Sequence, residues 1–419
     1  MGISSALYSG VSGLKTSSHA MSVIGNNLAH TNTTGFKGAR TVFSDLLSAN
    51  VSGSGGTSQI GRGVNLSKVD NIFSQGTFEA TESGLDVAIE GDSFFTLREA
   101  GDDTTYYTRA GAFRFDEEGF LINPEGYRVQ GQQFNPATNE LLPGDPSDIH
   151  VINSGLIPAS ATTAVDLTTN LDAGASEPPL AFDYTLPETY NYSTSVQVFD
   201  SLGNNHLITT YYRKDPAANT WNWYWSAQDS TGADVGSATT GTAAQLTFDT
   251  DGTKLTPPAP VAVGPINWLN GADPSNITIA FDTTQFNSNS AVIAQDQDGF
   301  AAGDLTSVDI NEEGIVVASY SNGEQTNIAQ LILAKFQNPG GLMMKGSNMF
   351  VANASSGTPR TGLPGPELGK IFTNSLEQSN VDMGTEFVRM ITVQRGFQAN
   401  SKIITTIDEL LGELINLKR

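Results

Sequence analysis

The chain has 419 residues, no cysteine and a formal net charge of −23. Without cysteine it can form no disulfide, thiolate metal site or cysteine nucleophile, and its negative charge disfavours binding to nucleic acid or to an anionic membrane. At about 100 to 200 residues per domain, this length predicts two to four domains.

The charge is unevenly distributed along the chain. Residues 1–50 carry a net charge of +2 and residues 375–419 a net charge of −1, so the middle of the chain carries −24. We expect the acidic middle to face water and the nearly neutral ends to pack side by side.

The N-terminal segment predicts a helix with one narrow apolar stripe. Its apolar residues recur at intervals of four, three, seven and seven, the spacing of a coiled-coil seam: Leu7, Val11, Leu14, Met21 and Leu28. A helix that packs on a globular core is the alternative interpretation. Because an isolated helix is marginal in water, we expect both chain ends to be largely unstructured in the free subunit and to become helical when many copies pack together.

Two further expectations concern this N-terminal segment. Asn32, Thr33, Thr34 and Gly35 are expected to end the helix, because Asn and Gly tolerate left-handed backbone geometry and Thr disfavours helix interiors; Phe36 would pin the turn. The opening residues lack a basic segment before a long apolar core, so we expect export without a cleaved signal peptide. No apolar run approaches the roughly 18 residues that a membrane helix needs.

The middle of the chain predicts strands and turns. Gly/Ser- and Pro/Gly-rich stretches predict connectors at 48–75 and 355–369. Alternating apolar and polar residues predict an inner β domain from 76–158 with 295–354, and a second β domain, 159–294, inserted into it. Similar sequences at 113–122 and 308–317 predict two hairpins that turn at Gly119 and Gly314.

The inserted block contains two patterns that resemble ligand sites. Asp249, Asp251 and Gly252, and likewise Asp296, Asp298 and Gly299, have the opening of a calcium loop but lack the later acidic ligands, and Asp-Gly turns are common in hairpins. Trp221, Trp223 and Trp225 would share one strand face; we favour a hydrophobic core over a glycan site.

The C-terminal segment predicts a second long helix within residues 370–419. Its apolar residues recur every seventh position at Leu376, Met383, Met390, Phe397, Ile404 and Leu411, with Phe387 and Ile407 between them. The fold class predicted overall is mainly β and multidomain, with a coiled-coil-like pair of terminal helices. The stripes predict a polymer interface made of Leu7, Val11, Leu14, Met21, Leu28, Met383, Phe387, Met390, Phe397, Ile404 and Leu411.

No pattern of catalytic residues emerges from the sequence. His19, His30, His150 and His206 are isolated and are expected to be surface or packing residues. A nucleophile elbow, a phosphate loop and a dinucleotide fingerprint are all missing. We therefore expect no enzyme activity, no cofactor and no bound metal.

Three segments resemble the flagellar rod and hook family of axial proteins. NNLAHTNTTGFK (Asn26–Lys37) is similar to its N-terminal signature, GTFEATESGLDVAIEGDSFF (Gly76–Phe95) to its first inner-domain strands, and SLEQSNVDMGTEFVRMITVQRGFQANSKIITTIDELL (Ser375–Leu411) to its C-terminal signature. The signature residues that match are Asn27, Asn32, Thr34, Gly35, Phe36, Asn380, Asp382, Gln394 and Arg395.

The resemblance implies a function. The size of the inserted block, together with FDSLGNNHLITTYY (Phe199–Tyr212), favours the hook members of that family over its rod members. Such proteins form a curved tube that transmits torque as a universal joint and encloses an export channel, with the terminal helices, 1–47 and 370–419, as its inner wall. The implied partners are further copies of the chain, the distal rod, the hook cap, the hook-filament junction proteins and the export apparatus, at an extracellular location. A distal rod protein and an extracellular β-rich adhesin are the alternatives.

Overall fold

The computed structural model describes residues 2–53, 56–135, 138–151, 155–237, 245–253, 255–256 and 260–417. The chain divides into two compact units. Unit 1 comprises Met1–Asn153, Val308–Ala318 and Thr326–Arg419, and unit 2 comprises Ser154–Ser307 and Ser319–Gln325. The predicted fold class is confirmed: strands dominate both units, and the described residues form an α-helix at each end of the chain.

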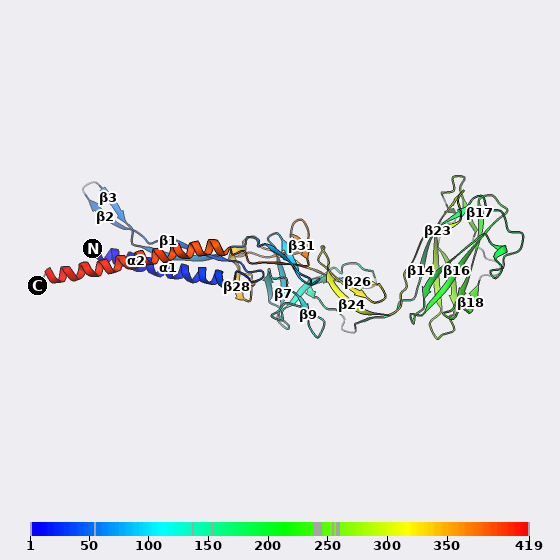
Figure 1. Ribbon diagram of the computed structural model, residues 1–419, viewed down its shortest axis with the longest axis horizontal. Coiled ribbons are helices and arrows are strands. Elements are labelled where there is room, and N and C mark those ends of the chain that lie inside the picture. Colours follow the sequence, from blue (N-terminus) through cyan, green and yellow to red (C-terminus); the bar gives the residue numbers. More distant parts are fainter. Residues whose placement is uncertain are drawn as a thin grey trace. The chain divides into compact units, whose positions relative to one another are not determined.

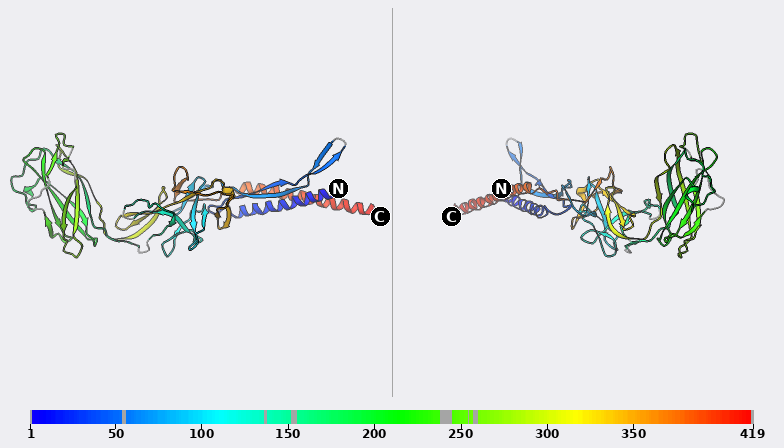
Figure 2. Two further views of the ribbon diagram at one scale, coloured as in Figure 1. Left: turned by 180° about the vertical axis from the view of Figure 1, so that it is seen from behind. Right: turned by 45° about the vertical axis from the view of Figure 1, so that its right-hand side comes forward.

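The two helices of unit 1 lie side by side and run antiparallel. α1 spans Gly2–Ala29 and α2 spans Met383–Leu417, and the views in Figure 1 and Figure 2 show both chain ends at the same end of this pair. The sequence predicted the second helix within residues 370–419, and in the structure this helix begins at Met383.

The residues before α2 form strands instead of helix. β31 (Lys370–Thr373) pairs with β6 (Val87–Glu90), and β32 (Ser375–Glu377) pairs with β5 (Phe78–Ala80). Leu376 lies in β32 opposite Glu79, so its assignment to the helical stripe was wrong. Its heptad spacing from Met383 was outweighed by strand pairing with a segment about 300 residues away in sequence.

The turn after α1 has the expected left-handed residue. α1 ends at Ala29, before the predicted terminating segment begins at Asn32, and Gly35 follows in the turn with a φ of +68°. A Cβ atom on Gly35 would lie 2.5 Å from the backbone nitrogen of Ala110, so the close approach also requires glycine. Phe36 is buried, and its ring lies 4.6 Å from that of His30 in an edge-to-face contact.

The predicted connector at 48–75 contains strands. β1 (Ala39–Asp45) pairs antiparallel with β4 (Val64–Asn71), and β2 (Ala49–Gly53) pairs with β3 (Gly56–Ile60). The β1–β4 ribbon contacts α1, where the Val64 backbone N–H donates to Ser12 Oγ at 3.2 Å. Within the second predicted connector, 355–369, the structure has the short strand β30 (Arg360–Gly362).

Most of the remaining strands of unit 1 form one irregular antiparallel sheet, whose buried side chains make two hydrophobic clusters. Hydrogen bonds link its strands along the path β26, β11, β7, β8, β29, β28. The bounds are β7 (Phe94–Arg98), β8 (Thr105–Thr108), β9 (Arg114–Phe115), β10 (Leu121–Ile122), β11 (Arg128–Gln133), β12 (Ser147–Asp148), β26 (Gln325–Leu331), β27 (Leu333–Lys335), β28 (Met343–Gly346) and β29 (Met349–Val351).

Both predicted hairpins are confirmed. β9 pairs with β10 around Gly119, which has a φ of +88°. β24 (Gly303–Ile310) is the neighbour of β25 (Ile315–Tyr320), and Gly314 between them has a φ of +76°.

Unit 2 consists mainly of two sheets that share one hydrophobic core. The first runs β21, β22, β14, β23, with β14 and β22 parallel; the second runs β15, β16, β17, β19, β20, with β18 on β17. The bounds are β13 (Leu156–Ile157), β14 (Ala164–Asp172), β15 (Tyr192–Phe199), β16 (Asn205–Lys214), β17 (Thr220–Gln228), β18 (Asp234–Ser237), β19 (Gln245–Phe248), β20 (Leu255–Thr256), β21 (Val261–Ile266), β22 (Ser275–Phe286) and β23 (Ala291–Gln297).

The tryptophan strand belongs to this core. Trp221 and Trp223 are buried and Trp225 packs against them partly buried, so the prediction of a core role is confirmed. The Trp221 indole also donates to Gln285 Oε1 at 2.8 Å, which satisfies its only polar group.

A buried carboxylate ties two loops of unit 2 together. Asp200 accepts hydrogen bonds from His206 at 2.9 Å, from the Asn270 side chain at 2.5 Å and from the Asn204 side chain at 3.2 Å, and the His206 ring stacks on Trp268. Burial alone would raise the pKa of Asp200, but these hydrogen bonds outweigh burial and lower the pKa below its ordinary value.

We predict that Asp200→Asn lowers the free energy of unfolding of unit 2 at pH 7 by about 1.5 to 3 kcal/mol, because hydrogen bonds to a charged group are lost. Since the folded-state pKa is lowered, the wild-type advantage is complete above the unfolded pKa of about 4 and shrinks as the pH falls below it. All four tryptophans lie in unit 2, so their fluorescence during urea unfolding reports on this unit. Asp282→Asn, at an exposed strand position, is the control; equal losses in both variants would contradict the prediction.

Candidate assembly surface

The contact between α1 and α2 is made by small residues at close range. A Cβ atom on Gly10 would lie 3.2 Å from Ile404 Cγ1, and one on Gly13 would lie 2.5 Å from Asn400 Nδ2. Further along the antiparallel pair, a Cβ on Gly396 would lie 3.9 Å from Ser17 Oγ. α1 thus contributes small residues to this seam, and α2 meets them with Asn400, Ile404 and Gly396. Most of the apolar stripe that the heptad spacing marked lies outside the seam.

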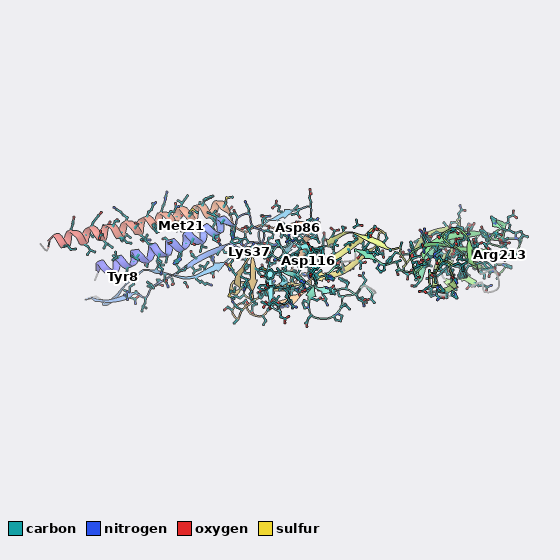
Figure 3. The ribbon with its side chains drawn as sticks, turned by 90° about the horizontal axis from the view of Figure 1, so that it is seen from below. Tyr8, Met21, Lys37, Asp86, Asp116 and Arg213 are labelled. Carbon is teal, nitrogen blue, oxygen red and sulfur yellow. The ribbon has the colours of Figure 1, made fainter. Side chains whose placement is uncertain are left out.

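The predicted polymer-interface residues remain accessible in this structure. Five are exposed, among them Phe387 and Met383 at 50% each, and the other six are half-buried. The exposed set is Val11, Met383, Phe387, Phe397 and Leu411; the half-buried set is Leu7, Leu14, Met21, Leu28, Met390 and Ile404, of which Ile404 also contacts the seam at Gly10. Figure 3 shows Tyr8 and Met21 along α1.

Other apolar side chains extend this accessible surface. Tyr8 is 71% exposed, and Val388 and Ile391 are also exposed, although the sequence pattern did not mark them. Ile415, which the C-terminal stripe includes at an intermediate position, is exposed as well. Contiguous exposed apolar surface on a soluble chain typically marks an interaction site. We therefore treat the outward faces of α1 and α2 as the candidate assembly surface.

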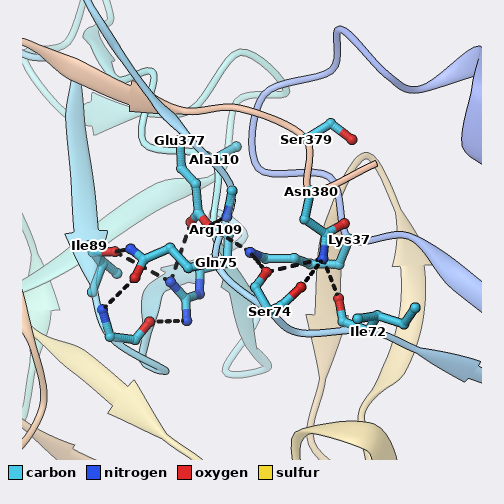
Figure 4. Close-up of polar contacts among 12 residues, drawn as sticks. Lys37, Ile72, Ser74, Gln75, Ile89, Arg109, Ala110, Glu377, Ser379 and Asn380 are labelled. Carbon is cyan, nitrogen blue, oxygen red and sulfur yellow. Dashed lines mark hydrogen bonds and ion pairs between the residues drawn. The ribbon is translucent and has the colours of Figure 1, made fainter. Parts of the chain in front are cut away.

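A buried ionic cluster lies where the two chain ends join the sheet of unit 1. The Glu377 carboxylate lies 2.6 Å from Lys37 Nζ and 3.3 Å from Arg109 Nη1, and the side chains of all three residues are fully buried. Figure 4 shows Glu377 between the two cations. Lys37 Nζ also donates to the Ser74 carbonyl at 2.8 Å, and Arg109 Nη2 donates to the Gly91 carbonyl at 2.5 Å.

The cluster holds more positive than negative charge away from water. Burial lowers the pKa of Lys37 and of Arg109, and the charge of Glu377 opposes both shifts. Breaking such a buried pair by removing one partner typically costs about 3 to 5 kcal/mol, because the other charge stays buried and uncompensated. The cluster is therefore a strong constraint on how the ends attach.

Several signature residues support the same junction. Asn380 accepts from the Gly38 N–H at 2.8 Å and donates to the Ile72 carbonyl at 2.7 Å. Asn27 exchanges two hydrogen bonds with the Ala39 backbone, at 2.8 and 3.0 Å, and donates to Glu386 at 3.4 Å.

The remaining signature residues have different environments. Asp382 caps α2 by accepting from the Thr385 N–H at 2.6 Å. Hydrogen bonds from the Thr385 side chain and from its backbone N–H lower the pKa of Asp382. The Thr34 carbonyl accepts from the Asn348 side chain at 3.0 Å. Asn32, Gln394 and Arg395 are exposed.

Sequence reasoning missed the residues that build the cluster and the seam. Lys37 and Glu377 lay inside the quoted signatures but were not singled out, and Arg109 and the seam glycines were overlooked. A charged residue between apolar neighbours in the segment GFKGA is the one local sign that Lys37 is buried.

The other candidate sites have structural explanations. Gly252 donates its N–H to the Asp249 carbonyl in a tight turn, and Asp298 accepts from the backbone of Thr163 and Ala164. Within the described part of the chain, no three His, Cys, Asp or Glu residues gather as a metal would require. No helix among the described residues is long and apolar enough to cross a membrane.

Four family profiles match the chain in order. They are "Flagella basal body rod protein" at residues 7–37, "Flagellar hook protein FlgE/F/G D1 domain" at 88–163, "Flagellar basal body protein FlaE D2 domain" at 170–300 and "Flagellar basal body rod FlgEFG protein C-terminal" at 373–417.

Similar proteins match over nearly their whole length. The chain is 35% identical to the flagellar hook protein FlgE of Borreliella burgdorferi, with 99% of each chain covered, and 34% identical to that of Escherichia coli K12, with 97% of this chain and 98% of the other covered. The crystal structure of Helicobacter pylori flagellar hook protein FlgE2 matches 72% of this chain and all of that chain with a TM-score of 0.54 at 16% identity, which supports the fold.

We predict that Gly13→Leu lowers the stability of the helix pair by about 1 to 3 kcal/mol, because the added side chain overpacks the contact with Asn400. Gly25→Leu is the matched control: nothing lies within 4 Å of a Cβ at Gly25, and leucine favours helix by about 0.5 to 1 kcal/mol over glycine. Urea unfolding of concentrated full-length protein, followed by circular dichroism at a helical wavelength, measures both. Equal stability of the two variants would argue against a close-packed seam.

Proposed function

Because the chain belongs to the flagellar hook protein family, we propose that many copies of it form a curved, flexible tube. The chain is a structural subunit of the bacterial flagellar hook and assembles with other flagellar proteins into the axial structure. In this proposal the tube transmits torque from the rod to the filament as a universal joint and encloses the export channel. The terminal segments 1–47 and 370–419 form its inner wall.

The accessible apolar stripe of the terminal helices is the observation that supports this proposal. α1 and α2 already contact each other through small residues, so the larger apolar side chains are available to neighbouring copies. Fully burying one such side chain contributes about 1.5 to 3 kcal/mol. Assembly therefore has a driving force that a single copy leaves unused.

We propose that the ends become ordered as copies assemble. Exposed apolar faces and a narrow seam give the helices of one copy little burial to offset the cost of ordering, about 1 to 2 kcal/mol per residue for the backbone. Packing against neighbours supplies the missing burial.

The contrast between the chain's ends and its acidic middle supports the proposed flexibility. Continuous apolar contacts between the terminal helices would transmit torque without slip. Polar and like-charged surfaces of unit 2 would make contacts that are individually weak and easily exchanged. Rows of subunits could then shorten and lengthen as a curved tube turns.

We further propose an extracellular location, contacts with the distal rod, hook cap, junction proteins and export apparatus, and no enzymatic role. The match to the hook relatives over nearly the whole chain supports the hook function over the distal-rod and adhesin alternatives.

We predict that Phe387→Asp raises the concentration needed for tube formation about tenfold or more. The substitution removes an apolar side chain that assembly would bury and introduces a charge, and about 1.4 kcal/mol corresponds to each factor of ten. Leu186→Asp is the control, because Leu186 has nearly the same exposure, 49%, but lies in unit 2. Sedimentation and electron microscopy measure assembly. Tubes of Phe387→Asp at the wild-type concentration would contradict the proposed interface.

We also predict that removing most of unit 2 preserves assembly and changes the curvature or stiffness of the tube. The predicted insertion, 159–294, can be excised more cleanly at Ser160 and Phe300, whose backbones exchange two hydrogen bonds of 3.0 Å. Residues 161–299 are replaced by Asn-Gly, which closes a two-residue hairpin. Electron microscopy then compares the shape of the tubes with wild type. Unchanged curvature and flexibility would remove unit 2 from the bending mechanism.

A further inference from the structure

We propose that Lys37, Arg109 and Glu377 form a terminal latch that makes the docking of the two chain ends mutually dependent, so that neither end docks stably on the sheet of unit 1 without the other. The inference deepens the proposed function, because docking of the ends is the step that assembly requires. It assigns to the buried cluster a regulatory role in addition to stability.

The latch joins segments that are far apart in the sequence. Glu377 accepts from Lys37, from Arg109 and, at 2.8 Å, from the Gly76 N–H, while its own carbonyl accepts from the Gly35 N–H at 2.7 Å. Lys37 follows α1, and Glu377 precedes α2. Arg109 follows β8 and belongs to the sheet region that both ends dock onto.

A state in which only one of the two chain ends is docked leaves charges of the cluster unpaired and is therefore disfavoured. If the C-terminal segment leaves, Lys37 and Arg109 face each other without the carboxylate that lies between them. If the N-terminal segment leaves, Glu377 loses its closest cation and the Ser74 carbonyl loses the ammonium group. A buried charge without its partner is far less stable than the complete cluster. The fully docked state and the state with both ends released are therefore favoured over mixtures.

The uncharged hydrogen bonds near the cluster do not account for the coupling between the two chain ends. Asn380 also bridges the two ends through Gly38, but its side chain is partly accessible to water. Water can replace hydrogen bonds at such a position, whereas it cannot reach the three charged side chains. The charged cluster is the part of the junction in which loss of one partner is most costly.

Hydrogen exchange of the full-length protein tests the latch. Lys37→Met removes the cation from the N-terminal segment, and Glu377→Gln removes the anion from the C-terminal segment. Arg40→Met, in β1 just after Lys37, and Glu79→Gln, in β5 beside the strand that holds Glu377, are matched controls at accessible positions. Exchange is measured by mass spectrometry, with dilute and assembled wild type as references.

Each variant is expected to affect the opposite helix. Lys37→Met should speed amide exchange in α2, and Glu377→Gln should speed it in α1, each by a factor of about 5 to 150, the range of coupling between linked sites. The controls should match wild type in both helices. The double variant should exchange little faster than either single variant, because both remove the same interaction.

Two outcomes would overturn the latch. The first is faster exchange confined to residues near each substitution, with wild-type protection of the opposite helix. The second is a wild-type chain whose ends remain unprotected at every concentration. Failure of the proposed function has a different signature, namely protected and coupled ends in a wild-type chain that forms no tubes. Unchanged exchange in β14 and β22 verifies that unit 2 stays folded in every variant.

Discussion

The Glu377 carboxylate is the contact on which the attachment of both chain ends depends. It is fully buried, and the two cations that neutralise it come from segments 340 and 268 residues away in the sequence. Because unpaired charge is costly away from water, the carboxylate fixes the position of the strand before α2 against the turn after α1. The register of the two helices follows, since Asn27 near the end of α1 donates to Glu386 near the start of α2 at 3.4 Å.

In the terminal helices of unit 1, residues of different size lie on different faces. Glycine and serine let the two helices of one chain approach closely, and the larger apolar side chains are left on the outward faces. If leucine and phenylalanine filled the seam within one chain, little apolar surface would remain for neighbours. In the proposed tube, the small residues of the seam thus leave the apolar stripe to be buried by other copies of the chain.

Local patterns predicted the parts of the fold that depend on neighbouring residues. The hairpins around Gly119 and Gly314 and the core role of Trp221 followed from alternation and turn chemistry. Leu376 was misassigned because strand pairing with distant residues overrode its heptad spacing. The sequence did not predict the cluster of Lys37, Arg109 and Glu377. Its members come together only in the folded chain, and no regular spacing in the sequence relates them. The resemblance to the axial family located two of the three segments but not the charge balance between them.

The paired backbones of Ser160 and Phe300 determine how unit 2 experiences mechanical load. Residues 161–299, which include the strands of the tryptophan core, leave the chain and return to it at this one bridge. Tension carried along the covalent chain can enter and leave through the bridge without stretching the core. In the proposed tube this core would therefore lie off the load path, and its contacts with neighbouring copies would yield without unfolding it.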